Sequence, residues 1–328
     1  MKGQLEVSFQ WVYVLIAGGA FLLMFFFVFK SCTESGDERA QGMSVRATAN
    51  AISLAAWQEG SVNFTFAADV SCVGDVLTLQ ALEGTARSQL DQVPAFLPPR
   101  LAGKSNVVTR EVALTQTGVP SIRLGNVVYA LDERTRYYVQ RSHETRLKHV
   151  LGNSPSIIYV DSFSNLQVPG GVETVVLVGD NLPAVTLPQT KAKVYGVTLS
   201  EPQAIFYTAS NDRLGSPKVE LYTGDYMMVG AVVAARPQTY RCAKENFARR
   251  TGAVLGIYHT RNENLAIDFQ NIPDPRTQVC IEPLMRANLL IFNLIDGRSA
   301  RLDDLSTATT PLMTHQRTLQ GLGCPVIA

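Results

Sequence analysis

The hydrophobic pattern at the start of the chain is an unbroken apolar run, Trp11 to Phe29, of nineteen residues without a charged side chain. At about 1.5 Å rise per residue, a helix of this length measures about 28 Å, close to the roughly 30 Å hydrocarbon core of a bilayer. A cleaved secretory signal has a shorter apolar region and ends in small residues, whereas this run stays bulky up to Lys30. The pattern therefore predicts a retained transmembrane helix that contacts the lipid bilayer through residues 11–29.

A second hydrophobic pattern lies in residues 43–57, where Val45, Ala49, Ile52 and Ala56 recur at 4-3-4 spacing. Apolar residues at this spacing form one stripe of an amphipathic helix. A polar stretch that contains glycines separates this segment from the apolar run. The chain therefore either continues as one long helix or crosses a juxtamembrane linker, and both alternatives remain open.

Beyond residue 60 the pattern changes to the two-residue period and short apolar runs that are typical of strands. The expected strands are 62–70, 107–116, 124–131, 135–140, 156–161, 172–179, 191–199, 202–208, 218–224 and 226–234. The runs 157–161 and 174–179 are almost wholly apolar, which is typical of central strands that are covered on both faces. A short helix is expected at 142–151.

The last third of the chain has helical periodicity. Helices are expected over the proline-free segment 240–269, over 280–295, and over 302–319, where Pro311 is expected to interrupt the helix. Strands followed by helices predict an α+β fold, here an N-terminal transmembrane helix followed by a β-rich mixed-sheet domain with C-terminal helices packed on it. The expected divisions are a leader and transmembrane helix (1–33), a juxtamembrane linker or amphipathic helix (34–60) and one extracytoplasmic domain (61–328).

Composition and charge exclude several classes of function. The 46% apolar content, 17% charged content and net charge of +1 are those of a folded protein with no expected nucleic-acid partner. The five cysteines form no CxxC pair, so a zinc ribbon or a thioredoxin-like motif has no support. No metal, cofactor or catalytic residue is expected.

A short motif precedes the apolar run: Lys2-Gly3-Gln4, with Glu6 and Ser8 following it. It resembles the class III leader of archaeal type IV pilin-like proteins, although their usual Gln-x-Ser-x-Glu order has Ser and Glu exchanged here. In that family a peptidase cuts after the Gly on the cytoplasmic side and leaves the hydrophobic helix on the mature subunit. The resemblance implies cleavage after Gly3, and a long N-terminal helix that is hydrophobic first and amphipathic second.

Three blocks of the folded part also carry a resemblance. AFLPPRLAG (95–103), LGNVVYALDERTRYYV (124–139) and MVGAVVAARPQTYRCAKENFARR (228–250) resemble blocks in uncharacterised single-pass membrane proteins of small-genome archaea. Those proteins also begin with a Lys/Arg-Gly-Gln leader and one hydrophobic helix. The resemblance implies a membrane anchor and an exterior domain, and it implies no activity.

The charges that flank residues 11–29 favour one orientation. The α-amino group, Lys2 and Glu6 precede the run, whereas the other flank has Lys30 and Arg39 with the acidic residues Glu34, Asp37 and Glu38. The positive-inside rule then places the N-terminus in the cytoplasm and the main domain outside the cell. The alternative is the opposite orientation, with the domain facing the cytosol.

An exterior domain permits disulfides and glycosylation. The expected cysteine pairs are Cys242 with Cys280, near the starts of successive helices, and Cys72 with Cys324, which joins the first strands to the C-terminus. Buried free thiols are the alternative. Asn63 begins an Asn-Phe-Thr glycosylation sequon, and its alternative role is a plain position on the solvent face of a strand.

The search for catalytic motifs gives little. HETRLKH at 143–149 lacks the i, i+4 histidine spacing of a zinc helix, and GxSxG, Walker-A and GxGxxG motifs are absent. Asp161, Asp180 and Asp225 each follow an apolar run, where aspartate serves either as a site carboxylate or as a turn residue.

We therefore expect a membrane-anchored extracytoplasmic structural or binding protein, a pilin-like cell-surface or filament subunit that self-assembles or contacts other membrane or surface proteins. The alternatives are a hydrolase-like enzyme on the cell surface and a cytosol-facing accessory subunit of a membrane complex.

Overall fold

A computed structural model of the chain describes residues 39–82, 85–164, 166–210, 213–296, 299–300 and 302–327, together with the isolated positions 19, 22–24 and 26. Most of the expected transmembrane segment 11–29 therefore lies outside the described residues. Among the residues that are described, no helix combines the length and the apolar character needed to cross a membrane.

Sheet A is a six-stranded, largely antiparallel sheet. Its spatial order is β3 (Arg87–Leu90), β2 (Val76–Ala81), β1 (Gly60–Val73), β5 (Arg100–Gln116), β6 (Val119–Asp132) and β4 (Ala95–Phe96). The long strands β1 and β5 pair from Gly60 opposite Thr109 to Asp69 opposite Arg100. The sequence pattern predicted β1, β5 and β6, whereas β2, β3 and β4 had no predicted counterpart.

Sheet B is a six-stranded mixed sheet. Its spatial order is β12 (Arg213–Leu221), β11 (Gln203–Ser210), β10 (Lys193–Ser200), β9 (Thr174–Val178), β7 (Thr135–Gln140) and β8 (Ile157–Val160). The strands β8, β7, β9 and β10 are parallel to one another, and β11 and β12 continue the sheet antiparallel. All of these strands were predicted, and β9 is central and buried as expected. The expectation that 157–161 is also a central strand is wrong, because β8 lies at the edge of sheet B and is only partly buried.

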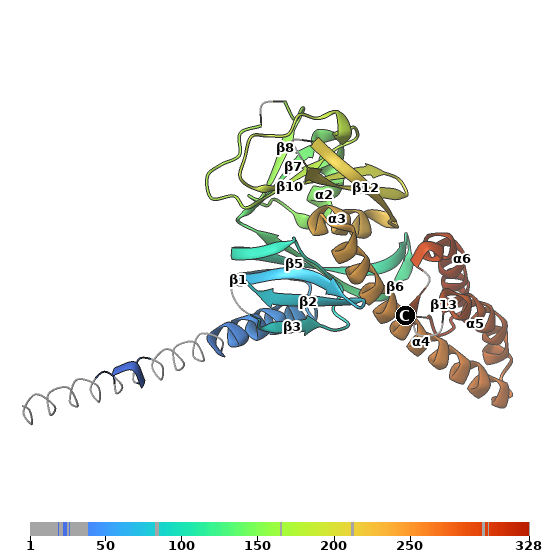
Figure 1. The fold of residues 1–328 in the computed structure, drawn as a ribbon. Helices are drawn as coiled ribbons and strands as arrows, with labels where there is room; N and C mark the ends of the chain where they lie inside the picture. Colours follow the sequence, from blue (N-terminus) through green and yellow to red (C-terminus); the bar gives the residue numbers. More distant parts are fainter. Residues whose placement is uncertain are drawn as a thin grey trace, which may run out of the picture.

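The α-helices described after residue 60 are α2 (Glu144–Leu151), α3 (Gly224–Ala234), α4 (Pro237–Asn271), α5 (Pro275–Leu294) and α6 (Leu302–Gly321). The short pieces β13 (Ile295–Asp296) and β14 (Ser299–Ala300) form a small hairpin between α5 and α6. The helix α4 runs from the two sheets into an arm in which α5 packs beside α4 and α6 packs beside α5 (Figure 1). The α+β class, with mixed sheets and C-terminal helices, is confirmed.

The helix α6 continues through Pro311, which was expected to interrupt it. The two residues after the proline, Leu312 and Met313, are wholly buried. Proline removes one helical hydrogen bond. Packing of the following turn into the core offsets this loss, which the sequence pattern alone does not reveal.

The segment 226–234 forms the buried helix α3, and its prediction as a strand is wrong. An apolar run of this length is compatible with a buried strand or a buried helix, and periodicity does not separate them. Every residue from Met227 to Ala234 is buried. The helix lies between sheet A and sheet B (Figure 1), so all of its faces are covered and none needs polar side chains.

Gly230 allows α3 to approach sheet A closely. A Cβ atom at this position would lie 2.6 Å from Cε1 of Phe96, nearer than side-chain atoms pack. Phe96 is wholly buried and stacks on Tyr129 and Tyr240, with 5.7 Å between ring centroids in each pair. The residue at this point of α3 must therefore lack a side chain.

Each sheet donates one tyrosine hydroxyl to the backbone of α3. Tyr129 of β6 donates to the carbonyl of Tyr226 at 2.9 Å, and Tyr137 of β7 donates to the carbonyl of Val233 at 3.2 Å. Val233 lies in the last turn of α3, where carbonyls lack helical partners. Burial raises the pKa of both phenols far above its usual value, so the hydroxyls remain protonated donors.

The strands next to α3 are buried on both faces, as their alternating side chains show. In β6, Tyr129 and Leu131 face the core that contains α3, whereas Val128 and Ala130 face a second core on the other side of sheet A. In β7, Tyr137 faces α3 and Tyr138 faces a third core on the outer side of sheet B. Because successive side chains of a strand point to opposite faces of the sheet, the residues of β6 and β7 contribute to three separate hydrophobic cores.

We expect Tyr137→Phe to lower the free energy of unfolding by about 1–3 kcal/mol, because the buried Val233 carbonyl loses its partner. Tyr159→Phe is the matched control, since the Tyr159 hydroxyl is buried without a hydrogen-bond partner among the described residues. Removing that hydroxyl should leave stability unchanged or raise it. Denaturant titration of both variants measures the difference, and equal losses would contradict the role of the Val233 contact.

Candidate functional site

The first candidate site is the contact between an N-terminal helix, residues 39–55, and sheet A. The predicted stripe is buried: Val45, Ala49, Ile52 and Ala56 are each at most 4% exposed. The opposing surface comes from the face of sheet A that points away from α3. Its members include Phe66, Ala68, Val70, Leu77, Leu79 and Val107. The amphipathic helix predicted from the 4-3-4 spacing is therefore confirmed, and Gly42 lies within it.

Polar side chains of sheet A hold the end of this helix. Thr109 donates to the carbonyl of Ala55 at 2.8 Å, and Asn126 donates to the carbonyl of Ala56 at 3.0 Å. These carbonyls lie at a helix terminus, where backbone acceptors lack helical partners. The guanidinium of Arg250 also lies over the ring of Trp57, 5.2 Å from its centroid. Helix 39–55 is thus fixed to the folded part by both an apolar stripe and a capped end.

The leader residues Gly3, Gln4 and Glu6, and the fifth cysteine Cys32, lie outside the described residues. Cleavage after Gly3 therefore stays a prediction.

We expect Ile52→Ala to lower the free energy of unfolding by about 2–5 kcal/mol, because Ile52 is wholly buried under sheet A. Leu54→Ala is the control on the same helix, since Leu54 is 71% exposed. It should change stability by less than about 0.5 kcal/mol. Thermal unfolding, with hydrogen exchange of residues 39–55, measures both. A stable Ile52→Ala variant with unchanged exchange would show that the stripe does not hold the helix.

The four predicted cysteines form two disulfides, but the predicted pairing is wrong. Cys72 pairs with Cys242, with 6.1 Å between Cα atoms, and Cys280 pairs with Cys324, with 5.7 Å between Cα atoms. The first bond joins β1 to α4, and the second joins α5 to the segment after α6.

The length of α4 explains why Cys242 does not reach Cys280. Cys242 lies in the first turns of this 35-residue helix, and Cys280 lies in α5 just beyond its far end. At about 1.5 Å per residue, the helix puts roughly 40 Å between the two positions. The C-terminal segment returns along α5, and Cys324 meets Cys280 there instead.

Asn63, the predicted glycosylation site, lies in β1 opposite Asn106 of β5 and is exposed. Its side chain is open to solvent, which modification of the sequon requires. Glycosylation itself stays a prediction.

We expect replacement of Cys280 and Cys324 by Ser to cost about 2–5 kcal/mol, with the effect confined to the helical arm. Hydrogen exchange in α5 and α6 should rise while sheet A keeps its protection. In the matched variant, with Cys72 and Cys242 replaced by Ser, exchange should rise where α4 packs on β1 and β2. Identical exchange maps for the two variants would contradict this division.

The second candidate site is at the carboxyl edge of sheet B. The chain passes from β7 through α2 to β8 on one side, then crosses to β9 and β10 on the other side of β7. The helix α2 lies on the face that also contacts α3, whereas the connections 161–173 and 179–192 cover the opposite face. This is the doubly wound arrangement, whose switch point lies here between β7 and β9. Ligands bind at that position in open α/β sheets.

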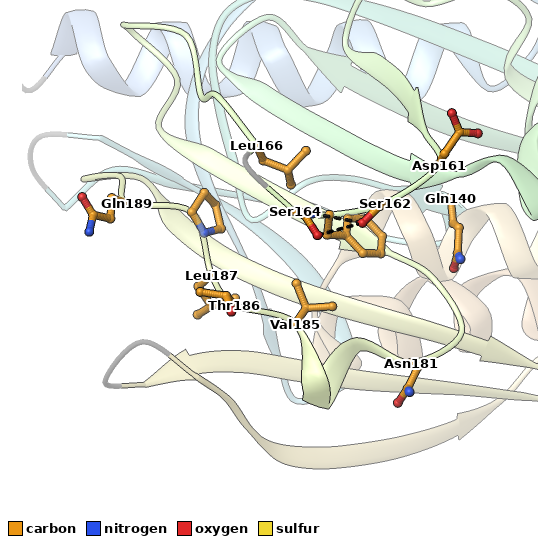
Figure 2. A pocket seen from close by; sticks show the side chains of 12 residues that line it. Gln140, Asp161, Ser162, Ser164, Leu166, Asn181, Val185, Thr186, Leu187 and Gln189 are labelled. Atoms are coloured by element: carbon orange, nitrogen blue, oxygen red, sulfur yellow. Dashed lines mark hydrogen bonds between the residues drawn. The ribbon is translucent and has the colours of Figure 1, made fainter.

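A cavity of about 570 Å³ opens between the connections 161–173 and 179–192 (Figure 2). Gln140, the last residue of β7, lines it together with residues that directly follow β8 and β9. Its size is within the range of small-molecule sites. The cavity therefore lies where the strand order changes direction, and both loops that contribute to it begin at strand ends.

Buried side chains and one close backbone contact hold the two loops. Phe163 and Leu182 are buried on the outer face of sheet B, and Tyr138 donates to the carbonyl of Gln167 at 2.9 Å. A Cβ atom on Gly179 would lie 2.8 Å from Cε2 of the buried Phe163 ring and 2.7 Å from Oε1 of Gln140, which favours glycine at the end of β9. The Oε1 atom accepts from the N–H of Asp180 at 3.1 Å. The cavity is thus built from anchored segments.

The three aspartates that follow apolar runs do not form a carboxylate cluster. Each is paired with a basic side chain of the segment 141–146: Asp161 with Arg141 at 2.8 Å, Asp180 with His143 at 3.1 Å, and Asp225 with Arg146 at 2.6 Å. Within the described part of the chain, no group of three or more His, Cys, Asp or Glu side chains is arranged to hold a metal ion.

Sequence reasoning considered Asp161 but missed the cavity beside it. The residues that line the cavity come from separate loops, and none of them belongs to a recognisable motif. No family model matches this chain, and neither the curated proteins nor the solved structures that were compared with it give a match.

Proposed function

We propose that this chain is a membrane-anchored structural or binding protein of the cell exterior, with the pilin-like plan of an N-terminal helix that carries a folded domain. The observation that carries the proposal is the docking of helix 39–55 on sheet A. An apolar segment of membrane-spanning length, residues 11–29, precedes helix 39–55 in the chain. The apolar stripe of that helix packs on sheet A, and side chains of sheet A donate hydrogen bonds to the carbonyls at its C-terminal end.

The two disulfides support an exterior location for the domain. Disulfides persist in oxidising compartments and are rare in the cytosol. Here the first disulfide joins β1 of sheet A to α4, and the second joins α5 to the C-terminal segment within the helical arm. A cytosol-facing accessory subunit would have little use for such bonds.

Leader cleavage is the part of the proposal that separates a filament subunit from a plain anchor. Cleavage after Gly3 would make Glu6 the third residue of the mature chain. A carboxylate in an apolar helix is costly unless it is paired, and the terminal amine of a neighbouring subunit would pair with it.

Mass spectrometry of the protein purified from membranes tests the leader. We expect the mature chain to begin at Gln4, and Gly3→Val to keep the leader because the peptidase of the resembled family cuts after a glycine. Ser8→Ala, a substitution beyond the cut, should leave processing intact. A natural N-terminus at Met1 or Lys2 would eliminate the filament-subunit proposal and leave the anchor.

Protease treatment of intact cells tests the location. We expect the folded part to be digested or released from outside, and non-reducing peptide maps to show the two cross-linked pairs. A domain that is protected in intact cells and digested after lysis would overturn the exterior location.

A further inference from the structure

The cavity at the carboxyl edge of sheet B has an unusual setting for a doubly wound sheet. In nucleotide sites of this topology, a glycine-rich turn leads into a helix whose N-terminus binds phosphate. Here β8 is followed by an irregular loop, and β9 is followed by the single turn η2 (Leu182–Ala184). The strand β7 leads through the turn η1 (Arg141–His143) into α2, and no residue of η1 or α2 lines the cavity. The described lining therefore comes from the end of β7 and from the two loops.

The polar part of the lining is rich in hydroxyl and amide groups. Its uncharged polar members are Gln140, Ser162, Ser164, Asn181, Thr186 and Gln189. Each of these side chains can both donate and accept hydrogen bonds. The hydroxyl oxygens of Ser162 and Ser164, in the loop that follows β8, are hydrogen-bonded to each other at 3.0 Å. Such a set matches a ligand that carries many hydroxyls.

The charge of the cavity argues against an anionic ligand. Asp161 is the ionisable side chain among the lining residues, and no Lys, Arg or His belongs to that set. The nearby Arg141 is engaged with Asp161 at 2.8 Å. Phosphate and carboxylate ligands are bound by cationic side chains or helix N-termini, and the lining supplies neither.

Apolar side chains form the rest of the wall. Leu166 from the first loop and Val185, Leu187 and Pro188 from the second are partly buried, and the buried Phe163 also lines the cavity. A sugar ring has hydroxyls at its edge and C–H groups on its faces, so it needs both kinds of surface. Mostly apolar walls with a few placed polar groups are typical of small-molecule sites.

We propose that this cavity binds a neutral saccharide. The hydroxyl and amide side chains of the loops would form hydrogen bonds with the sugar hydroxyls, and Leu166 and Val185 would pack against the C–H face of the sugar ring. The cavity is formed within the described domain. It requires neither the leader cleavage nor the membrane location proposed above, so the two proposals fail or hold separately.

The test uses the full chain in detergent micelles and three neutral disaccharides as probes: maltose, lactose and N,N′-diacetylchitobiose. Saturation-transfer NMR and calorimetry should show saturable binding of at least one of them, and no comparable binding of inorganic phosphate. Thr186→Ala should weaken that binding about threefold to tenfold, the loss of one hydrogen bond. Val185→Trp, which fills the cavity, should abolish it.

Thr318→Ala is the matched control, because Thr318 is an exposed threonine on α6, outside the cavity lining. The Thr318→Ala variant should bind the disaccharide with the same affinity as the unmodified chain. Thr186 is exposed, so its variant tests the site even if Val185→Trp fails to fold. Absence of binding by all three sugars, binding unchanged in Thr186→Ala, or preferential binding of phosphate would each overturn the proposal.

Discussion

The burial of α3 between two sheets is the constraint on which the rest of the structure depends. A helix with no polar face is stable in a globular protein only when other elements cover it on all sides. Sheet A covers one side and sheet B the other, and each sheet donates a tyrosine hydroxyl to its backbone. Gly230 sets the separation on the side of sheet A, because any side chain there would meet Phe96. The two sheets are therefore held as layers around one apolar element.

A buried carboxylate fixes the junction where the chain passes from sheet A to sheet B. Asp132, the last residue of β6, accepts hydrogen bonds from the N–H of Ala102 at 2.8 Å, from Ser105 Oγ at 3.0 Å and from the N–H of Arg134 at 2.8 Å. Burial raises the pKa of Asp132, and these hydrogen bonds oppose that shift. Ser156, just before β8, donates to its carbonyl at 3.0 Å. Hydrogen bonds to Asp132 thus connect β5, the end of β6 and the start of sheet B.

The layered core leaves two outer faces, and each bears one candidate site. Helix 39–55 covers the far face of sheet A and connects the domain to the apolar N-terminal segment. On the far face of sheet B, loops take the place of helices, and they enclose the cavity at the switch point. The two candidate sites thus lie on the outer faces of different sheets, with the α3 core between them. A ligand in the cavity would be bound away from the surface that holds the N-terminal helix.

The sequence by itself determined the elements whose hydrophobic period is strong and local. The 4-3-4 stripe of helix 39–55 and the helices α4 to α6 follow from such periods, because side-chain direction repeats with the backbone. Nine of the ten predicted strands are also present, some from alternation and others from short apolar runs. Only the tertiary structure decided between helix and strand for residues 226–234, since an all-apolar run carries no period. It also decided the cysteine pairing, because the distance between Cys242 and Cys280 depends on the path of α4. The cavity at the switch point was also decided only by the tertiary structure. Its lining residues become neighbours only when β8 and β9 lie on opposite sides of β7, and no local pattern encodes that order.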